Sequence, residues 1–131
     1  MANKITGILI HVGFEKATVE TIDNTLEGLY SLLECDLVEI PTRKIGAPKG
    51  RYYTVVCDEE GLFAEHPKIS AIDNLGQPML VGNLFICNSD YENGELTSLT
   101  DDDIKYLSCF IKPQATNRYR KPYPMLHQCE Y

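Results

Sequence analysis

The chain has 131 residues, 44% hydrophobic and 24% charged, which is typical of one folded domain and argues against wholesale disorder. Its formal net charge of −7 makes a nucleic-acid or membrane partner unlikely for the body of the protein, because both attract a positive surface. Any anionic ligand must therefore be held by a local group of cations.

Cysteine and histidine usage predicts no metal site, no cofactor and no disulfide framework. The five cysteines include no CxxC pair and no histidine at ligand spacing, and an odd number does not close a set of disulfides. No apolar run in the sequence approaches the roughly 20 residues that cross a bilayer. We therefore expect a cytoplasmic protein with reduced thiols and no membrane contact.

The first third of the chain predicts a β-hairpin followed by a helix. Residues 4–13 and 16–22 are rich in β-branched and apolar side chains and flank a short turn. Residues 24–34 begin with polar residues that can cap a helix. They then place apolar side chains at the spacing of one helical face, at Leu26, Leu29, Tyr30 and Leu33.

The middle of the chain predicts short strands joined by loops. Residues 36–41 alternate apolar and polar side chains and stop at a proline, and residues 51–58 are strongly β-prone. A turn then leads to a further short strand at 62–65. Residues 66–79, with two prolines and a glycine, are expected to be mostly irregular.

The last third predicts two strands and a second helix. Residues 79–88 are a candidate for a buried strand, and residues 95–99 for a shorter one. Residues 100–111 begin with Thr100 as an N-cap, and Asp103 takes the place of the usual glutamate in a capping box.

These elements predict an α+β fold in a single domain at residues 1–112. Its mixed or antiparallel sheet has about five to seven strands and carries the two helices on one face. Periodicity ends at Pro113, so residues 113–131 are expected to form an extended C-terminal tail.

The segment TRKIGAPKGR, residues 42–51, reverses the sign of the chain's charge. Its glycines let backbone N–H groups approach phosphate oxygens, and its four cations can neutralise an anion: Arg43, Lys44, Lys49 and Arg51. Tyr52 and Tyr53 follow, and one of them could stack on a nucleotide base. Because the spacing is not that of a P-loop, a solvated connection between two strands is the alternative.

No catalytic arrangement is complete in the sequence. His11, His66 and His127 lie far apart, and no GxSxG elbow supports a triad. Acidic neighbours disfavour the thiolate of Cys57, and the aspartates at 101–103 suit a helix N-terminus better than a metal. We therefore expect a protein that is not an enzyme.

The tail interleaves basic and aromatic side chains, as proteins that bind single-stranded nucleic acid do. In an acidic chain we favour an arm that contacts another protein or a second copy of the chain in a homo-oligomer. The candidate contact residues are Arg118, Tyr119, Arg120 and Tyr123.

Four segments together resemble a family of small uncharacterised domains that are encoded mainly by phages, plasmids and integrative elements of bacteria. The segments are IDNTLEGLYSLL, VVCDEEGL, VGNLFICN and GELTSLTDDDIKYL, and the resemblance covers roughly residues 4–111. These motifs mark turns and helix starts rather than catalytic residues. The resemblance implies a bacterial host cell and a protein that acts by binding.

Two functions follow as hypotheses. The first is a non-enzymatic protein that captures a phosphate-bearing small molecule, such as a signalling nucleotide, with the 43–51 loop and a neighbouring tyrosine. The alternative is an anti-defence or regulatory module that inhibits a host protein through its acidic surface or its tail. A weaker third hypothesis is an enzyme whose site is assembled only by the fold.

Overall fold

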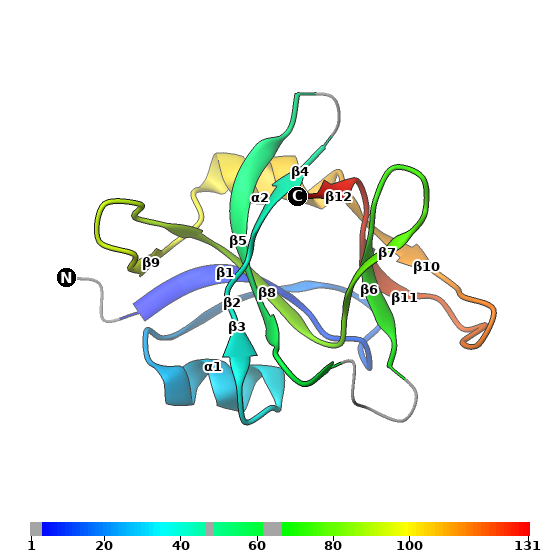
Figure 1. Cartoon of the computed structure of the whole chain (residues 1–131), viewed down its shortest axis with the longest axis horizontal. Coiled ribbons are helices and arrows are strands. Elements are labelled where there is room, and N and C mark those ends of the chain that lie inside the picture. Colours follow the sequence, from blue (N-terminus) through cyan, green and yellow to red (C-terminus); the bar gives the residue numbers. More distant parts are fainter. Residues whose placement is uncertain (1–3, 47–48, 62–66) are drawn as a thin grey trace.

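A computed structural model describes residues 4–46, 49–61 and 67–131 of the chain (Figure 1). Within those ranges there are two α-helices and twelve β-strands, arranged in two sheets. The prediction of two helices in a fold that combines helices with a largely antiparallel sheet is confirmed. The predicted number of strands is too low, because several two- to four-residue strands carry no periodic pattern that marks them in the sequence.

The first sheet is formed mainly by the N-terminal two thirds of the chain. Its members are β1 (Lys4–Ile10), β2 (Thr18–Asp23), β3 (Val38–Glu39), β4 (Thr42–Ile45), β5 (Arg51–Asp58), β8 (Leu84–Ser89), β9 (Leu96–Thr97) and β12 (Cys129–Glu130). The order is β12-β4-β5-β8-β1-β2, with β3 beside β5 and β9 beside β8. All of these pairs are antiparallel, and the predicted hairpin of β1 and β2 is confirmed.

The second sheet brings the C-terminal segment against the middle of the chain. Its members are β6 (Ile69–Ile72), β7 (Pro78–Val81), β10 (Ile111–Gln114) and β11 (Tyr123–Leu126), in the order β10-β11-β6-β7. Only β11 and β6 are parallel. In Figure 1 this sheet lies at the right, and β12 leads from it back to the first sheet.

One prediction in the middle of the chain is wrong, and another is incomplete. The prediction of mostly irregular structure for residues 66–79 leaves out β6 and the start of β7. The single strand predicted at 79–88 is divided by Gly82, whose φ of 77° lets the chain turn between β7 and β8. The strand predicted at 62–65 lies outside the described residues.

The extended tail is also corrected by the structure. Pro113 lies within β10, and β11 pairs on both of its sides, with β10 and with β6. Its side chains are buried, Tyr123 at 4% exposure and Leu126 at 0%. A strand buried on both faces is a short apolar run without alternation, so no period identified YPML as a strand.

The two helices cover opposite faces of the first sheet rather than one face. Leu29 and Leu33 of α1 (Leu26–Leu33) pack with Val56 and Phe85, whereas Leu107 of α2 (Asp101–Ser108) packs in the core between the two sheets. The residues of the two cores alternate along β1, β5 and β8, as opposite faces of a strand require. No helix among the described residues is long and apolar enough to span a membrane.

Both helices begin at threonine caps, the predicted Thr100 and, among the polar residues expected to start the first helix, Thr25. Thr25 accepts a hydrogen bond from the backbone N–H of Gly28 at 3.0 Å, and Thr100 accepts one from that of Asp103 at 3.1 Å. Asp103 in turn accepts from the backbone N–H of Thr100 at 3.0 Å, so the predicted capping box is confirmed.

Candidate functional site

The basic segment at 42–51 consists of β4, the connection after it and the first residue of β5. β4 and β5 pair antiparallel, with Arg43 opposite Tyr53, Lys44 opposite Tyr52 and Ile45 opposite Arg51. Successive side chains of a strand point to opposite faces, so Arg43 and Lys44 diverge. The four cations therefore do not converge on one point.

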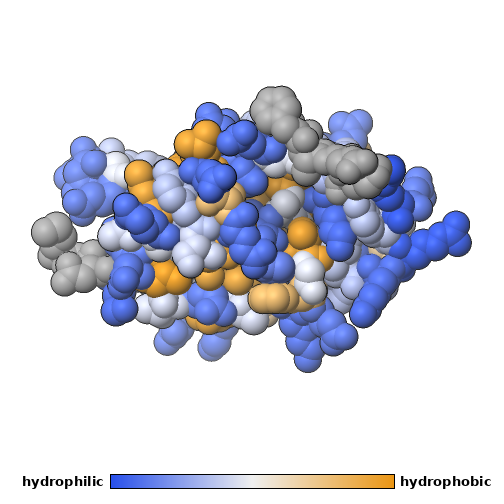
Figure 2. Space-filling view, turned by 90° about the horizontal axis from the view of Figure 1, so that it is seen from below, coloured by the Kyte–Doolittle hydropathy of each residue, from blue (hydrophilic) through white to orange (hydrophobic). Residues whose placement is uncertain are grey.

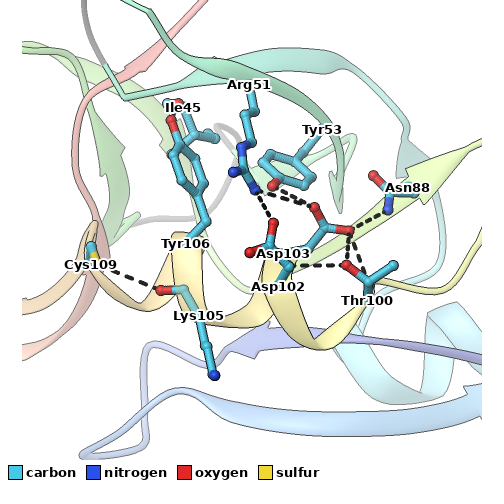
Figure 3. Close-up of polar contacts among 10 residues, drawn as sticks. All are labelled: Ile45, Arg51, Tyr53, Asn88, Thr100, Asp102, Asp103, Lys105, Tyr106 and Cys109. Carbon is cyan, nitrogen blue, oxygen red and sulfur yellow. Dashed lines mark hydrogen bonds and ion pairs between the residues drawn. The ribbon is translucent and has the colours of Figure 1, made fainter.

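Arg51 is neutralised by the first turn of α2 (Figure 3). Its Nη1 donates to Oδ2 of Asp102 at 2.8 Å and lies 3.9 Å from Oδ1 of Asp103. The guanidinium also stacks over the ring of Tyr106, with Cζ 4.2 Å from the ring centre. An arginine with these partners has little remaining capacity for an external phosphate.

Asp103 is the centre of this cluster. Its Oδ1 accepts from the Tyr53 hydroxyl at 2.9 Å, and its Oδ2 accepts from Nδ2 of Asn88 at 2.9 Å and from the Thr100 hydroxyl at 3.0 Å. Burial raises the pKa of the Asp103 carboxyl, but the hydrogen bonds from Thr100, Asn88 and Tyr53 lower it more, so the net pKa lies below its ordinary value. Burial, with the hydrogen bond to Asp103, raises the pKa of Tyr53 to about 12.

Tyr106 holds the end of the hairpin against α2. Its hydroxyl donates to the backbone carbonyl of Ile45 at 2.6 Å. The next residue, Gly46, has a φ of 90°, and a Cβ there would lie 2.4 Å from the Tyr106 oxygen. Glycine is therefore required at this position by both the backbone and the contact. The cluster as a whole stabilises the fold.

Arg43 lies on the inner face, beside a cavity of about 280 Å³ between β5 and β7. Its guanidinium stacks on Tyr131 at 4.6 Å, and its Nε is buried without a hydrogen-bond partner among the described residues. The cavity is also lined by three carboxylates, of Glu39, Asp58 and Glu59, which outnumber the guanidinium and disfavour a phosphate.

The other members of the predicted loop site are dispersed. Nζ of Lys44 lies 4.0 Å from a carboxylate oxygen of Glu130, and Lys49 and Tyr52 are exposed. Among these residues, the structure thus joins Arg51 and Tyr53 through Asp103, with Tyr53 buried and Arg51 at the surface.

The buried cysteines are poor nucleophiles. Burial raises the pKa of Cys57, Cys87 and Cys129 to about 12 in each case, which holds the thiols protonated.

His11 makes an ion-pair contact of 3.0 Å with Glu34, and burial lowers the pKa of His127. In the part of the chain that the structure describes, no group of three or more His, Cys, Asp and Glu side chains is placed to hold a metal.

A second basic region surrounds an open groove of about 710 Å³, which we call the 114–119 groove. One wall is the segment from Gln114 to Tyr119, and the other is formed by Pro67, Ile69, Ile72 and Gly76, with Met125 of β11. None of the described residues that line it is acidic. Figure 2 shows hydrophilic side chains extending from the right-hand end of the molecule, where Figure 1 places the β10–β11 connection.

The groove contains a cation, an aromatic ring and short polar side chains. Arg118 and Tyr119 line it together with the amide of Asn117 and the hydroxyl of Thr116. The ammonium of Lys68 lies 4.7 Å from the centre of the Tyr119 ring. Cations, an aromatic face and hydrogen-bond donors beside apolar side chains are what a nucleotide-sized anion requires.

A comparison with known protein families assigns most of the chain. Residues 5–112 match the family described as a domain of unknown function, DUF3846. The chain belongs to this family. No curated protein and no solved structure matches it. The DUF3846 match ends inside β10, so one wall of the groove lies within the matched residues and the 114–119 wall lies beyond them.

The contact residues predicted in the C-terminal segment differ in their positions. Arg118 and Tyr119 line the groove and Arg120 is exposed, but Tyr123 is buried and its hydroxyl donates to the carbonyl of Ile69 at 2.6 Å. Sequence reasoning missed the opposite wall, because the residues of 67–76 that line it, Pro67, Ile69, Ile72 and Gly76, carry no charge or motif that points to a ligand.

Proposed function

We propose that this member of the DUF3846 family is a binding protein for a phosphate-bearing small molecule of nucleotide size, held in the 114–119 groove. One observation carries the proposal: in a chain with a net charge of −7, the 710 Å³ groove is lined by an arginine and by no described carboxylate. An anion that enters the groove meets an arginine and no carboxylate among the described lining residues.

The arginine that lines the groove is available for a ligand. Arg118 is exposed, as are Arg120 and Lys121 just after it in the chain, and no ion pair joins any of the three to a carboxylate among the described residues. This is the opposite of Arg51, which two aspartates already neutralise. The proposed protein binds its ligand and does not catalyse a reaction. It acts in the cytoplasm of a bacterial cell that carries a phage or mobile element.

The test is isothermal titration of the full chain with a panel of mono-, di- and cyclic nucleotides and with inorganic phosphate. At least one nucleotide should bind, and added salt should weaken its binding because part of the attraction is between exposed charges. Arg118→Gln should weaken binding at least about tenfold, since a charge-assisted hydrogen bond contributes about 1.5–3 kcal/mol.

Two matched variants locate the site. Lys105→Gln removes an exposed cation from α2 and should leave the affinity unchanged. Arg43→Gln removes the inner arginine of the hairpin. A loss of binding in Arg43→Gln but not in Arg118→Gln would return the ligand to the β4–β5 hairpin, and no heat with any member of the panel would refute the proposal.

A further inference from the structure

We infer that the free edge of β2 binds an extended peptide of another protein, as an added antiparallel strand with the pattern apolar-basic-apolar. This inference is independent of the 114–119 groove. It rests on the direction of backbone groups in β2, on an apolar groove beside that strand, and on one carboxylate.

β2 is the last strand of the first sheet and pairs only with β1 among the described strands. The N–H of Thr6 in β1 donates to the Ser98 hydroxyl at 2.9 Å, and its carbonyl accepts from Leu99 N–H at 2.9 Å, both away from β2. Thr6 and its partner Thr21 are therefore a non-hydrogen-bonded pair. Their side-chain oxygens lie 2.7 Å apart, as the close approach of such a pair allows.

The backbone of Thr21 consequently points outward from the sheet. Because direction alternates along a strand, the N–H and C=O of Val19 point outward as well. Neither residue's backbone hydrogen-bonds to another described residue. Two donors and two acceptors are thus aligned along an open edge, which is the template that strand addition uses.

An apolar groove of about 220 Å³ lies next to this edge. Ile8, Ile104, Ile111, Pro113 and Pro124 contribute to its lining, together with Val19 itself. Three charged side chains, of Glu15, Lys16 and Lys112, also line it. Val19 is 53% exposed and is paired with Ile8, so its side chain lies on the face of the sheet that carries the inter-sheet core. Alternate residues of an added strand would place their side chains in this groove.

The other side of the groove does not offer an equivalent edge. β10 is the last strand of the second sheet, but it carries Pro113, which has no N–H, and the exposed Lys112. Proline and lysine are the residues that protect edge strands from pairing. β2 has neither.

Glu20 sets the charge of the peptide. It lies between Val19 and Thr21, and its side chain is on the opposite face from the groove. In an antiparallel addition, Val19 and Thr21 form hydrogen-bonded pairs, and the residue opposite Glu20 is in the closer non-hydrogen-bonded pair. A lysine or arginine there complements Glu20, and the residues on either side of it point into the groove.

A second copy of the chain is a poorer occupant. The antiparallel register that pairs Val19 with Thr21 of the second copy places two Glu20 side chains directly opposite each other. Both copies also carry a net charge of −7.

The experiment measures amide hydrogen exchange by NMR in the full chain, with and without the capped peptide Thr-Val-Lys-Val-Thr. The peptide should slow exchange at Val19 and Thr21 at least about tenfold at saturation, because it satisfies their N–H groups. Thr18 and Glu20, whose N–H groups face β1, are internal controls and should change little.

Charge and backbone variants sharpen the result. Replacing the central lysine of the peptide with glutamate should weaken binding roughly two- to fivefold, and Glu20→Lys should reverse that preference. N-methylation of the peptide valines should abolish protection. No protection at Val19 and Thr21 would refute the inference. So would protection of these amides in the free protein together with a dimer mass by light scattering, because a second copy would then occupy the edge.

Discussion

The two basic segments of this protein carry similar charges in the sequence and opposite electrostatic surroundings in the fold. In the β4–β5 hairpin, Arg51 is paired with two aspartates of α2, and Lys44 lies beside Glu130. In the segment after β10, Arg118, Arg120 and Lys121 are exposed, and Arg118 lines a groove without described carboxylates. The comparison teaches that a cluster of cations indicates an anion site only when distant carboxylates leave it unpaired.

The largest effect should show that the C-terminal segment, which contains β11, is packed in the hydrophobic core. Leu126→Ala should lower the free energy of unfolding by about 3 kcal/mol, because a fully buried leucine is removed from a packed core. Urea unfolding measures the change. Leu75→Ala is the control, since Leu75 is 80% exposed and should cost less than about 0.5 kcal/mol. Equal effects would restore the extended tail that the sequence predicted.

The second prediction concerns Asp103, which joins the β4–β5 hairpin to α2. Asp103→Ala should cost about 2–3 kcal/mol, because it removes the capping box and leaves the buried Tyr53 hydroxyl without its acceptor. Asp101→Ala, at an exposed position of the same helical turn, should cost less than about 1 kcal/mol. If the two variants unfold at the same urea concentration, the network around Asp103 does not stabilise the protein.

A smaller effect is expected where the hairpin ends. Tyr106→Phe removes only the hydroxyl that donates to the carbonyl of Ile45 and should cost about 1 kcal/mol. Tyr52→Phe, at an exposed side chain of the same hairpin, should change the midpoint of thermal unfolding by no more than the error of the measurement. A larger effect from Tyr52 would mean that the outer face of the hairpin, and not its contact with α2, fixes its position.

Acidification should weaken the contacts of Asp103 that join the β4–β5 hairpin to α2. The pKa of Asp103 is lowered in the folded protein, so the unfolded chain takes up a proton first. The contribution of Asp103 to stability is therefore complete above its ordinary pKa of 3.8 and is lost as the pH falls through the lower folded value. Urea midpoints between pH 6 and pH 3 should fall less steeply in Asp103→Asn than in the unchanged chain.

Local physics in the sequence determined the elements that depend on neighbouring residues. The N-cap at Thr100, the polar start of the first helix and the β1–β2 hairpin follow from propensity, capping and turn chemistry over a few residues, and these predictions are confirmed. The chain's overall acidity is likewise a property of composition alone.

Only the tertiary structure decided which charges meet and which strands are buried. The pairing of Arg51 with Asp102 joins residues 51 positions apart, and a separation of that size leaves no local pattern. β11 lacks alternation because the side chains on both of its faces are buried. Sequence alone therefore identified the two basic segments. The fold determined that Arg51 and Lys44 of the β4–β5 hairpin lie beside carboxylates and that Arg118 of the C-terminal segment lines the groove.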